Sequence, residues 1–208
     1  MAQLKHRNII AITRGIKPSE AAEVALAYME AGITRIEVPL NSPDPFASIS
    51  SMIDAVGSRA LIGAGTVLNI GQVEELKAAG GQFVVSPNAN PAVIAATKAG
   101  GMESWPGVMT PTECFSALDA GADGLKLFPA NLIGPGGVKA MRAVLPKQVP
   151  LYAVGGVADA NFAEYAQAGC NGFGLGSSLY KAGMLATEAG EKAAAAVEAH
   201  DAVFGPPA

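Results

Sequence analysis

Eight short apolar runs, rich in β-branched residues, recur along the chain and are separated by alanine-rich stretches. Each run is mostly uncharged, as is typical of a parallel strand that is buried on both faces. One marker residue near the carboxyl end of each run gives the spacing between successive runs, which is 23, 29, 20, 21, 19, 29 and 21 residues and suits a strand followed by one helix. The markers are Arg14, Glu37, Thr66, Ser86, Gly107, Lys126, Gly155 and Gly176. The runs cover residues 9–14, 33–40, 61–66, 82–87, 102–107, 124–128, 150–155 and 172–176.

The stretches between the runs carry helix start and stop signals. Pro18 opens the first stretch and Gly32 closes it, the order in which these residues favour helix ends. We expect helices over residues 18–31, 72–79, 91–99, 111–120, 161–168 and 188–203.

Eight such units predict an α/β fold, a small closed (β/α)₈ TIM barrel that forms one domain over residues 1–208. A doubly wound open sheet ranks second, because no Gly-x-Gly-x-x-Gly fingerprint follows the first run.

Composition excludes several partner classes. The 208 residues are 50% hydrophobic with a net charge of -4 and without a Lys/Arg stripe, so no nucleic-acid partner is predicted. No uncharged apolar stretch is long enough for a transmembrane helix, and no signal peptide is evident, so we expect no membrane partner and a cytoplasmic location. Cys114 and Cys170 lie far apart in the sequence and are expected to be buried thiols.

Lys126 is the first candidate for chemistry. Side chains of a barrel strand alternate between the helix layer and the interior, so Leu125 and Leu127 direct Lys126 inward. Burial disfavours an ammonium group, and the neutral amine that results is a nucleophile toward carbonyl carbon. The structural alternative is a lysine that reaches the rim or pairs with a carboxylate.

Glu37 and Arg14 accompany Lys126. Ile36 and Val38 form the apolar side of the second run, so Glu37 faces inward, and Arg14 ends the first run. The three charges could form a structural ion network, since buried charges tend to be paired. Their position at the carboxyl ends of three strands instead favours an active site, with an amine nucleophile, an acid/base and a clamp for a carboxylate.

Glycines close the last two runs. Gly155, Gly156, Gly176 and Ser177 lie where barrels often bind phosphate, and backbone N–H groups can surround its oxygens. The alternative is a pair of tight turns.

Lesser candidates follow the other runs. Thr66 and Pro87 are expected at the barrel mouth. His6 and His200 lie near the chain ends, and we expect both at the surface, with no metal site.

Five blocks occur in order along the chain, at residues 37–42, 63–67, 86–88, 125–130 and 153–157. Taken together, they resemble the 2-keto-3-deoxy-6-phosphogluconate (KDPG) aldolase family of pyruvate-dependent class I aldolases. The resemblance covers almost the whole chain and implies a barrel of class I aldolase type, catalysis by Lys126 and Glu37, no metal or other cofactor, and often a homotrimer. The implied substrate-binding residues are Arg14, Thr66, Pro87, Val154, Gly155, Gly156, Gly176 and Ser177.

Two departures resemble the family branch that acts on the galactonate epimer. Gluconate-type enzymes carry an arginine four residues after the catalytic glutamate, where this chain has Asn41, and Arg14 replaces it. They also carry Thr-Gly-Gly where this chain has Val154, Gly155 and Gly156. A hydroxyl lost near the substrate C4 hydroxyl changes which epimer is accepted. The implied reaction is reversible cleavage of 2-dehydro-3-deoxy-6-phospho-D-galactonate to pyruvate and D-glyceraldehyde 3-phosphate, in galactonate catabolism.

Three alternatives remain open at this point. The nearest is an aldolase for the gluconate epimer or for both epimers. A phosphosugar isomerase or epimerase would use Glu37 as a base and Lys126 only for its charge. A non-enzymatic sugar-phosphate sensor would have no need of the inward Lys–Glu pair.

Overall fold

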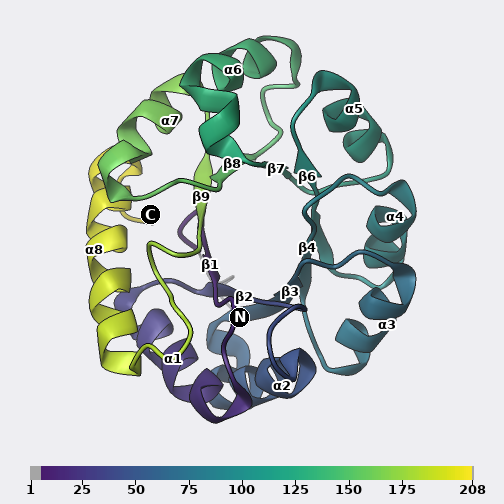
Figure 1. Cartoon of the computed structure of the whole chain (residues 1–208). Helices are drawn as coiled ribbons and strands as arrows, with labels where there is room; N and C mark the ends of the chain where they lie inside the picture. Colours follow the sequence, from purple (N-terminus) through teal and green to yellow (C-terminus); the bar gives the residue numbers. More distant parts are fainter. Residues whose placement is uncertain (1–5, 208) are drawn as a thin grey trace.

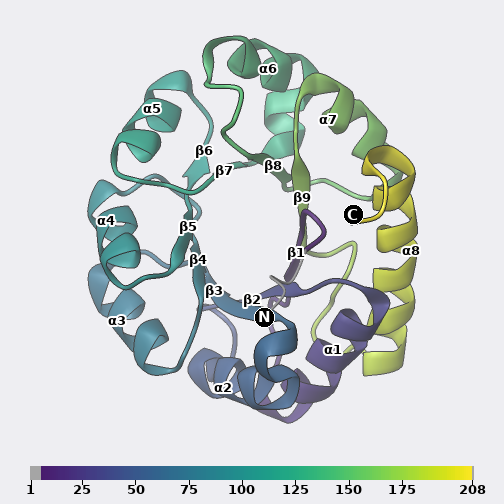
Figure 2. The same ribbon diagram turned by 180° about the vertical axis from the view of Figure 1, so that it is seen from behind.

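The structure, a computed structural model that describes residues 6–207, is a ring of parallel strands surrounded by helices (Figures 1 and 2). The strands lie in the order β5-β4-β3-β2-β1-β9-β8-β7-β6. They are β1 (Ile9–Ile12), β2 (Arg35–Pro39), β3 (Leu61–Gly65), β4 (Phe83–Val85), β5 (Glu103–Trp105), β6 (Gly107–Val108), β7 (Leu125–Leu127), β8 (Leu151–Val154) and β9 (Gly172–Leu175).

The predicted (β/α)₈ barrel is confirmed, with one correction to its strand count. The fifth run forms two strands, because Pro106 has no N–H group and separates β5 from β6. β5 pairs with β4, β6 pairs with β7, and the Pro106 carbonyl accepts the amide of Lys126 at 2.9 Å. The two short strands therefore share one position in the ring.

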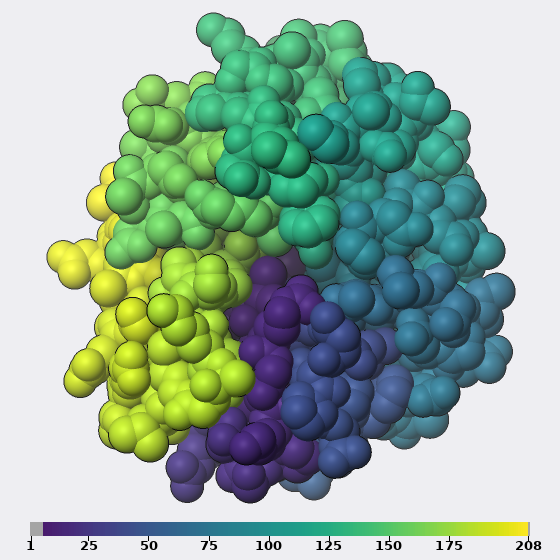
Figure 3. Space-filling model, viewed as in Figure 1, coloured from purple at the N-terminus to yellow at the C-terminus, as the bar shows by residue number. Residues whose placement is uncertain are grey.

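The expected helices are present, with ends within two residues of the predicted ones. α2 and α6 are additions that the sequence patterns did not delimit. α8 packs against α1, so the last and first helices of the chain are neighbours and complete the ring (Figures 1 and 3). The helices are α1 (Pro18–Ala31), α2 (Pro45–Val56), α3 (Ile70–Ala78), α4 (Pro91–Ala99), α5 (Pro111–Asp119), α6 (Ala130–Val144), α7 (Phe162–Ala168) and α8 (Ala186–Phe204).

Two apolar cores lie on the two sides of the strands. The larger core fills the space between strands and helices and includes Leu125, Leu127, Ile36 and Val38, all fully buried. A smaller core inside the barrel consists of Ile10, Phe83, Val85, Trp105 and Tyr152. This division confirms the predicted alternation along the two strands that carry Glu37 and Lys126.

Glycines on or next to the strands make room for the large interior side chains. A Cβ atom added at any of three glycines would come within 3.0 Å of an aromatic ring, closer than real Cβ contacts. Several glycines of the strand runs therefore serve packing. The pairs are Gly63 with Phe83, Gly124 with Trp105, and Gly172 with Tyr152.

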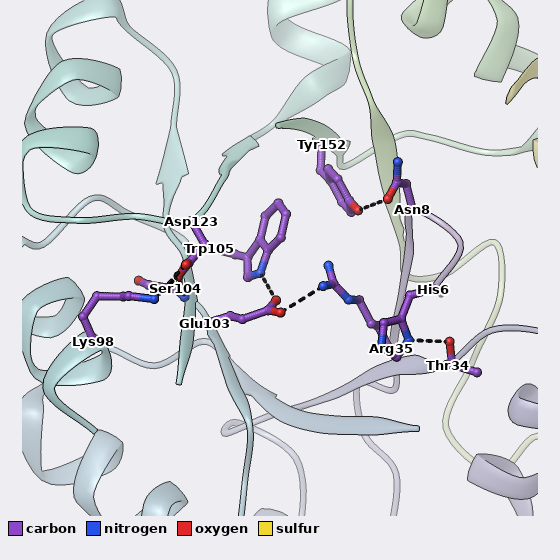
Figure 4. Close-up of polar contacts among 10 residues, drawn as sticks. All are labelled: His6, Asn8, Thr34, Arg35, Lys98, Glu103, Ser104, Trp105, Asp123 and Tyr152. Carbon is purple, nitrogen blue, oxygen red and sulfur yellow. Dashed lines mark hydrogen bonds and ion pairs between the residues drawn. The ribbon is translucent and has the colours of Figure 1, made fainter. Parts of the chain in front are cut away.

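A polar network occupies the amino ends of the strands (Figure 4). Glu103 accepts from Arg35 and from Trp105 Nε1, both at 3.0 Å, and the Tyr152 hydroxyl donates to Asn8 at 2.9 Å. A cavity of about 370 Å³ lies among these side chains, and none of the predicted site residues lines it. Most of the predicted site residues instead lie at the opposite end of the barrel, at the carboxyl ends of the strands.

The two histidines were both expected at the surface of the protein. The expected surface position of His200 is wrong: it is 3% exposed, because it extends the buried stripe of Ala189, Ala193 and Ala196 along α8. His6 is half-buried and contacts the Thr34 hydroxyl at 2.7 Å.

Cys114 and Cys170 are buried and free, as predicted. Among residues 6–207, no helix combines the length and the apolar character that crossing a membrane requires.

Candidate active site

Lys126 lies in the middle of β7 and points into the barrel with 7% of its surface exposed. Its Nζ lies 4.7 Å from the centroid of the Phe128 ring. Within the described part of the chain, no carboxylate oxygen comes within the 4.0 Å of an ion pair with Lys126. Burial lowers the pKa of Lys126, the charge of Arg14 lowers it further, and Glu37 opposes the shift. These conditions favour a neutral amine.

Glu37 lies on β2, is 2% exposed, and its Oε2 has no hydrogen-bond partner among the described residues. Burial raises the pKa of Glu37 to about 7, although the positive charges of Lys126 and Arg14 lower it. A carboxyl group with this pKa holds or releases a proton near neutral pH. That property suits a general acid/base.

Two neighbours fix the position of Glu37. A Cβ atom at Gly65, on β3, would overlap Oε2 of Glu37, so the carboxyl group needs a glycine there. The carbonyl oxygen of Glu37 accepts the amide of Thr13 at 3.0 Å and the Thr13 hydroxyl at 2.9 Å. Neither neighbour was among the residues predicted from the sequence.

A cavity of about 160 Å³ lies at the carboxyl ends of β1, β7, β8 and β9. Seven of the ten predicted site residues line it: Arg14, Lys126, Val154, Gly155, Gly156, Gly176 and Ser177. The cavity is also lined by Ile12, Phe128, Val157 and Gly174, which the prediction missed. Phe128 could have been found, because it lies two residues after Lys126 and therefore on the same side of the strand.

The glycine turn after β8 has the features of an anion site. Gly155 and Gly156 have φ angles of 94° and 72°, in the left-handed region that glycine adopts without strain. The N–H groups of Gly155, Gly156 and Ser177 donate to no other group of the residues that the structure describes. The Ser178 hydroxyl donates to the Val157 carbonyl at 3.2 Å and joins the two loops. Free backbone donors in one cavity wall suit phosphate oxygens.

Glu37, Thr66 and Pro87, the other three predicted site residues, lie outside this cavity lining. Thr66 follows Gly65 directly and has a φ angle of 58°, which is rare and strained for a β-branched residue. Such strain concentrates at functional sites. Pro87 follows β4 and is half-buried.

Known proteins resemble this chain over most of its length. The family model "KDPG and KHG aldolase" matches residues 1–196. The chain belongs to the KDPG and KHG aldolase family. A family relative in Rhizobium meliloti, named as a probable 2-dehydro-3-deoxy-6-phosphogalactonate aldolase, is 54% identical over 96% of this chain and 94% of its own length.

Two further family members carry the galactonate epimer in their names. The 2-dehydro-3-deoxy-6-phosphogalactonate aldolase of Escherichia coli K12 is 47% identical over 92% of this chain and 94% of its own length. A solved structure described as native KDPGal is 45% identical, with a TM-score of 0.95 over 99% of this chain and 100% of that one. Membership in the KDPG and KHG aldolase family confirms the predicted family and enzyme class and does not support the isomerase and sensor alternatives.

Proposed function

We propose that this protein is a class I aldolase that reversibly cleaves 2-dehydro-3-deoxy-6-phosphogalactonate to pyruvate and glyceraldehyde 3-phosphate. The observation that carries the proposal is that one end of the barrel contains both a buried lysine and a buried glutamate. Lys126 has no close counter-ion, and burial raises the pKa of Glu37. Lys126 supplies the nucleophile and Glu37 moves protons. The two galactonate-type relatives support this epimer over the gluconate one.

The reaction begins at the C2 ketone of the substrate. The neutral Lys126 amine attacks this carbon and forms a carbinolamine, which loses water to give a protonated Schiff base. Burial of Lys126 favours the neutral amine that this step requires. The cationic imine then withdraws electrons from the neighbouring C3–C4 bond.

Bond cleavage follows removal of the C4 hydroxyl proton. Glu37, directly or through a water molecule, accepts this proton while the C3–C4 bond breaks and its electron pair moves into the imine. The products are glyceraldehyde 3-phosphate and an enamine of pyruvate on Lys126. Glu37 helps return a proton to C3, and water then hydrolyses the Schiff base, which releases pyruvate and restores the free amine.

The remaining residues bind the substrate. Arg14 holds the C1 carboxylate, and the phosphate lies against Gly155, Gly156, Gly176 and Ser177, whose surroundings carry free N–H donors. Thr66 and Pro87 lie at the barrel mouth. Val154 presents only methyl groups near the C4 hydroxyl and contributes to the preference for the galactonate epimer.

Borohydride reduction in the presence of pyruvate tests the proposal. The expected result is an irreversible adduct that peptide mapping places on Lys126, together with loss of aldolase activity. Lys126→Met should show neither the adduct nor turnover, while circular dichroism shows an intact fold. A wild-type enzyme that traps no pyruvate at saturating concentration would overturn the Schiff-base mechanism.

Kinetics on both epimers test the substrate. We expect a higher kcat/KM for the galactonate epimer in the wild type, and a shift toward the gluconate epimer in Val154→Thr. An equal or reversed preference in the wild type would instead favour the gluconate-type or dual-specificity aldolase.

The proposal includes a homotrimer that acts in galactonate catabolism in the cytoplasm. Leu68, Ile70, Met109 and Phe115 are large apolar side chains with 43–47% of their surface exposed, and contact between subunits would cover such side chains. Sedimentation equilibrium should give three times the monomer mass. Cell fractionation that places the protein outside the cytoplasm would contradict the proposed location.

A further inference from the structure

Arg14 has one side-chain partner among the described residues. Its Nη1 donates to Oδ1 of Asn41, and the Asn41 side chain makes no other hydrogen bond in the described part of the chain. Both residues are exposed, and Arg14 lines the cavity that also contains Lys126. The contact therefore joins a cavity residue to a loop residue outside the cavity lining.

The loop that carries Asn41 is itself fastened to the loop that carries Arg14. The Ser42 hydroxyl accepts the amide of Gly15 at 3.0 Å, and the Ser42 amide donates to the Pro39 carbonyl at 2.9 Å. Two consecutive residues of one loop therefore contact two consecutive residues of the other: Arg14 contacts Asn41, and Gly15 contacts Ser42. The two hydrogen bonds of Ser42 therefore fix the backbone next to Asn41, which contacts Arg14.

Bracing matters because an exposed arginine side chain has many conformations. Fixing this side chain costs rotamer entropy, and its planar group binds a carboxylate well only when it presents two parallel donors. Arg14 lines the same cavity as Lys126, and its charge lowers the pKa values of both Glu37 and Lys126. A neutral amide partner takes up one donor and leaves the positive charge free for the substrate.

We infer that Asn41 is a positioning residue, and that it holds the Arg14 guanidinium so that its remaining donors face the substrate carboxylate. The inference deepens the proposed function and rests on it. It assigns to Asn41 a role in binding the pyruvyl half of the substrate. That half is common to both epimers, so Asn41 should not choose between them.

Asn41→Ala is the direct test. We expect it to raise KM and the half-saturating pyruvate concentration for borohydride trapping about tenfold, with kcat within about threefold, as loss of one charge-assisted hydrogen bond predicts.

Asp44→Asn is the matched control on the same loop. Asp44 is exposed, and its side chain makes no capping hydrogen bond at the start of α2. Asparagine keeps the shape of this side chain and tolerates the φ angle of 40° at this position. The control should therefore match the wild type in KM and in pyruvate trapping.

Asn41→Asp tests whether substrate binding depends on the position of the Arg14 guanidinium alone or also on its free positive charge. The new carboxylate would hold Arg14 firmly but neutralise it, so KM should rise at least as much as in Asn41→Ala. In the Arg14→Ala background, Asn41→Ala should have no further effect on pyruvate binding. The rise in KM should also be the same for both epimers.

The outcomes are distinguishable. A wild type that traps no pyruvate overturns the proposed function and this inference with it. If the wild type traps pyruvate but Asn41→Ala leaves its half-saturation unchanged, only the inference fails. It also fails if Asn41→Ala weakens pyruvate binding equally with and without Arg14, because the effect then does not act through Arg14.

Discussion

The carbonyl oxygen of Glu37 accepts two hydrogen bonds from Thr13, one from the amide at 3.0 Å and one from the hydroxyl at 2.9 Å. Both residues are buried, so neither donor has water as a substitute. The contact ties the end of β1 to the strand residue that carries the proposed catalytic carboxyl group.

Removal of the Thr13 hydroxyl should therefore weaken both the fold and the reaction. Thr13→Val keeps the shape but leaves one carbonyl lone pair without its second donor. We expect the free energy of unfolding to fall by about 1–2 kcal/mol and kcat to fall several-fold, while Thr13→Ser stays near the wild type. Chemical denaturation and steady-state kinetics measure the two effects. Equal stability and kcat in Thr13→Val and the wild type would contradict this view.

Gly65→Ala should displace the Glu37 carboxyl group, since the added methyl group would occupy the position of Oε2. We expect kcat to fall at least tenfold with a smaller change in KM, because proton transfer is sensitive to the position of the base. Gly71→Ala is the control, because its Cβ would meet only Asn69 Oδ1, at an ordinary 3.4 Å. A Gly65→Ala enzyme with wild-type kcat would show that the carboxyl group moves without consequence.

The pH profile of kcat/KM should show an acid limb governed by Glu37, whose pKa burial raises to about 7. Below this pH, Glu37 is protonated and cannot accept the C4 hydroxyl proton. Because the charge of Arg14 lowers the pKa of Glu37 and of Lys126, Arg14→Ala should move the limb to higher pH. An unmoved or lowered limb in Arg14→Ala would count against this electrostatic coupling.

Glu37 should also make stability depend on pH. Its pKa is about 7 in the folded protein and roughly 4.3 in an unfolded chain, so the folded state binds the extra proton between these values. The stability from this group is complete below about pH 4.3 and is lost as pH rises through about 7. Urea denaturation should show that the wild type loses up to about 4 kcal/mol of unfolding free energy relative to Glu37→Gln across this window. A constant difference would place the pKa of Glu37 near its ordinary value.

The fold and the charged centre could be predicted because both follow from local patterns. Strand alternation places Lys126 inward from Leu125 and Leu127 alone, and the same argument places Glu37. The break at Pro106 was within reach, because proline cannot donate in a sheet ladder.

Contacts between strands were not predictable in this way. That Gly65 faces the carboxyl group of Glu37, or that Asn41 meets Arg14, depends on how neighbouring strands and loops align. His200 was misplaced for a related reason, since its burial depends on which side of α8 faces the barrel.

Glycines opposite large side chains inside the barrel imply that its interior volume is shared between adjacent strands. In the cavity at the carboxyl ends of the strands, the same holds for Val154 and Gly174, because a Cβ atom at Gly174 would lie 2.7 Å from Val154 Cγ2. A larger residue at one position therefore requires a smaller one at its neighbour. Variants meant to accept new substrates should change such positions in pairs, one gaining the volume that the other loses.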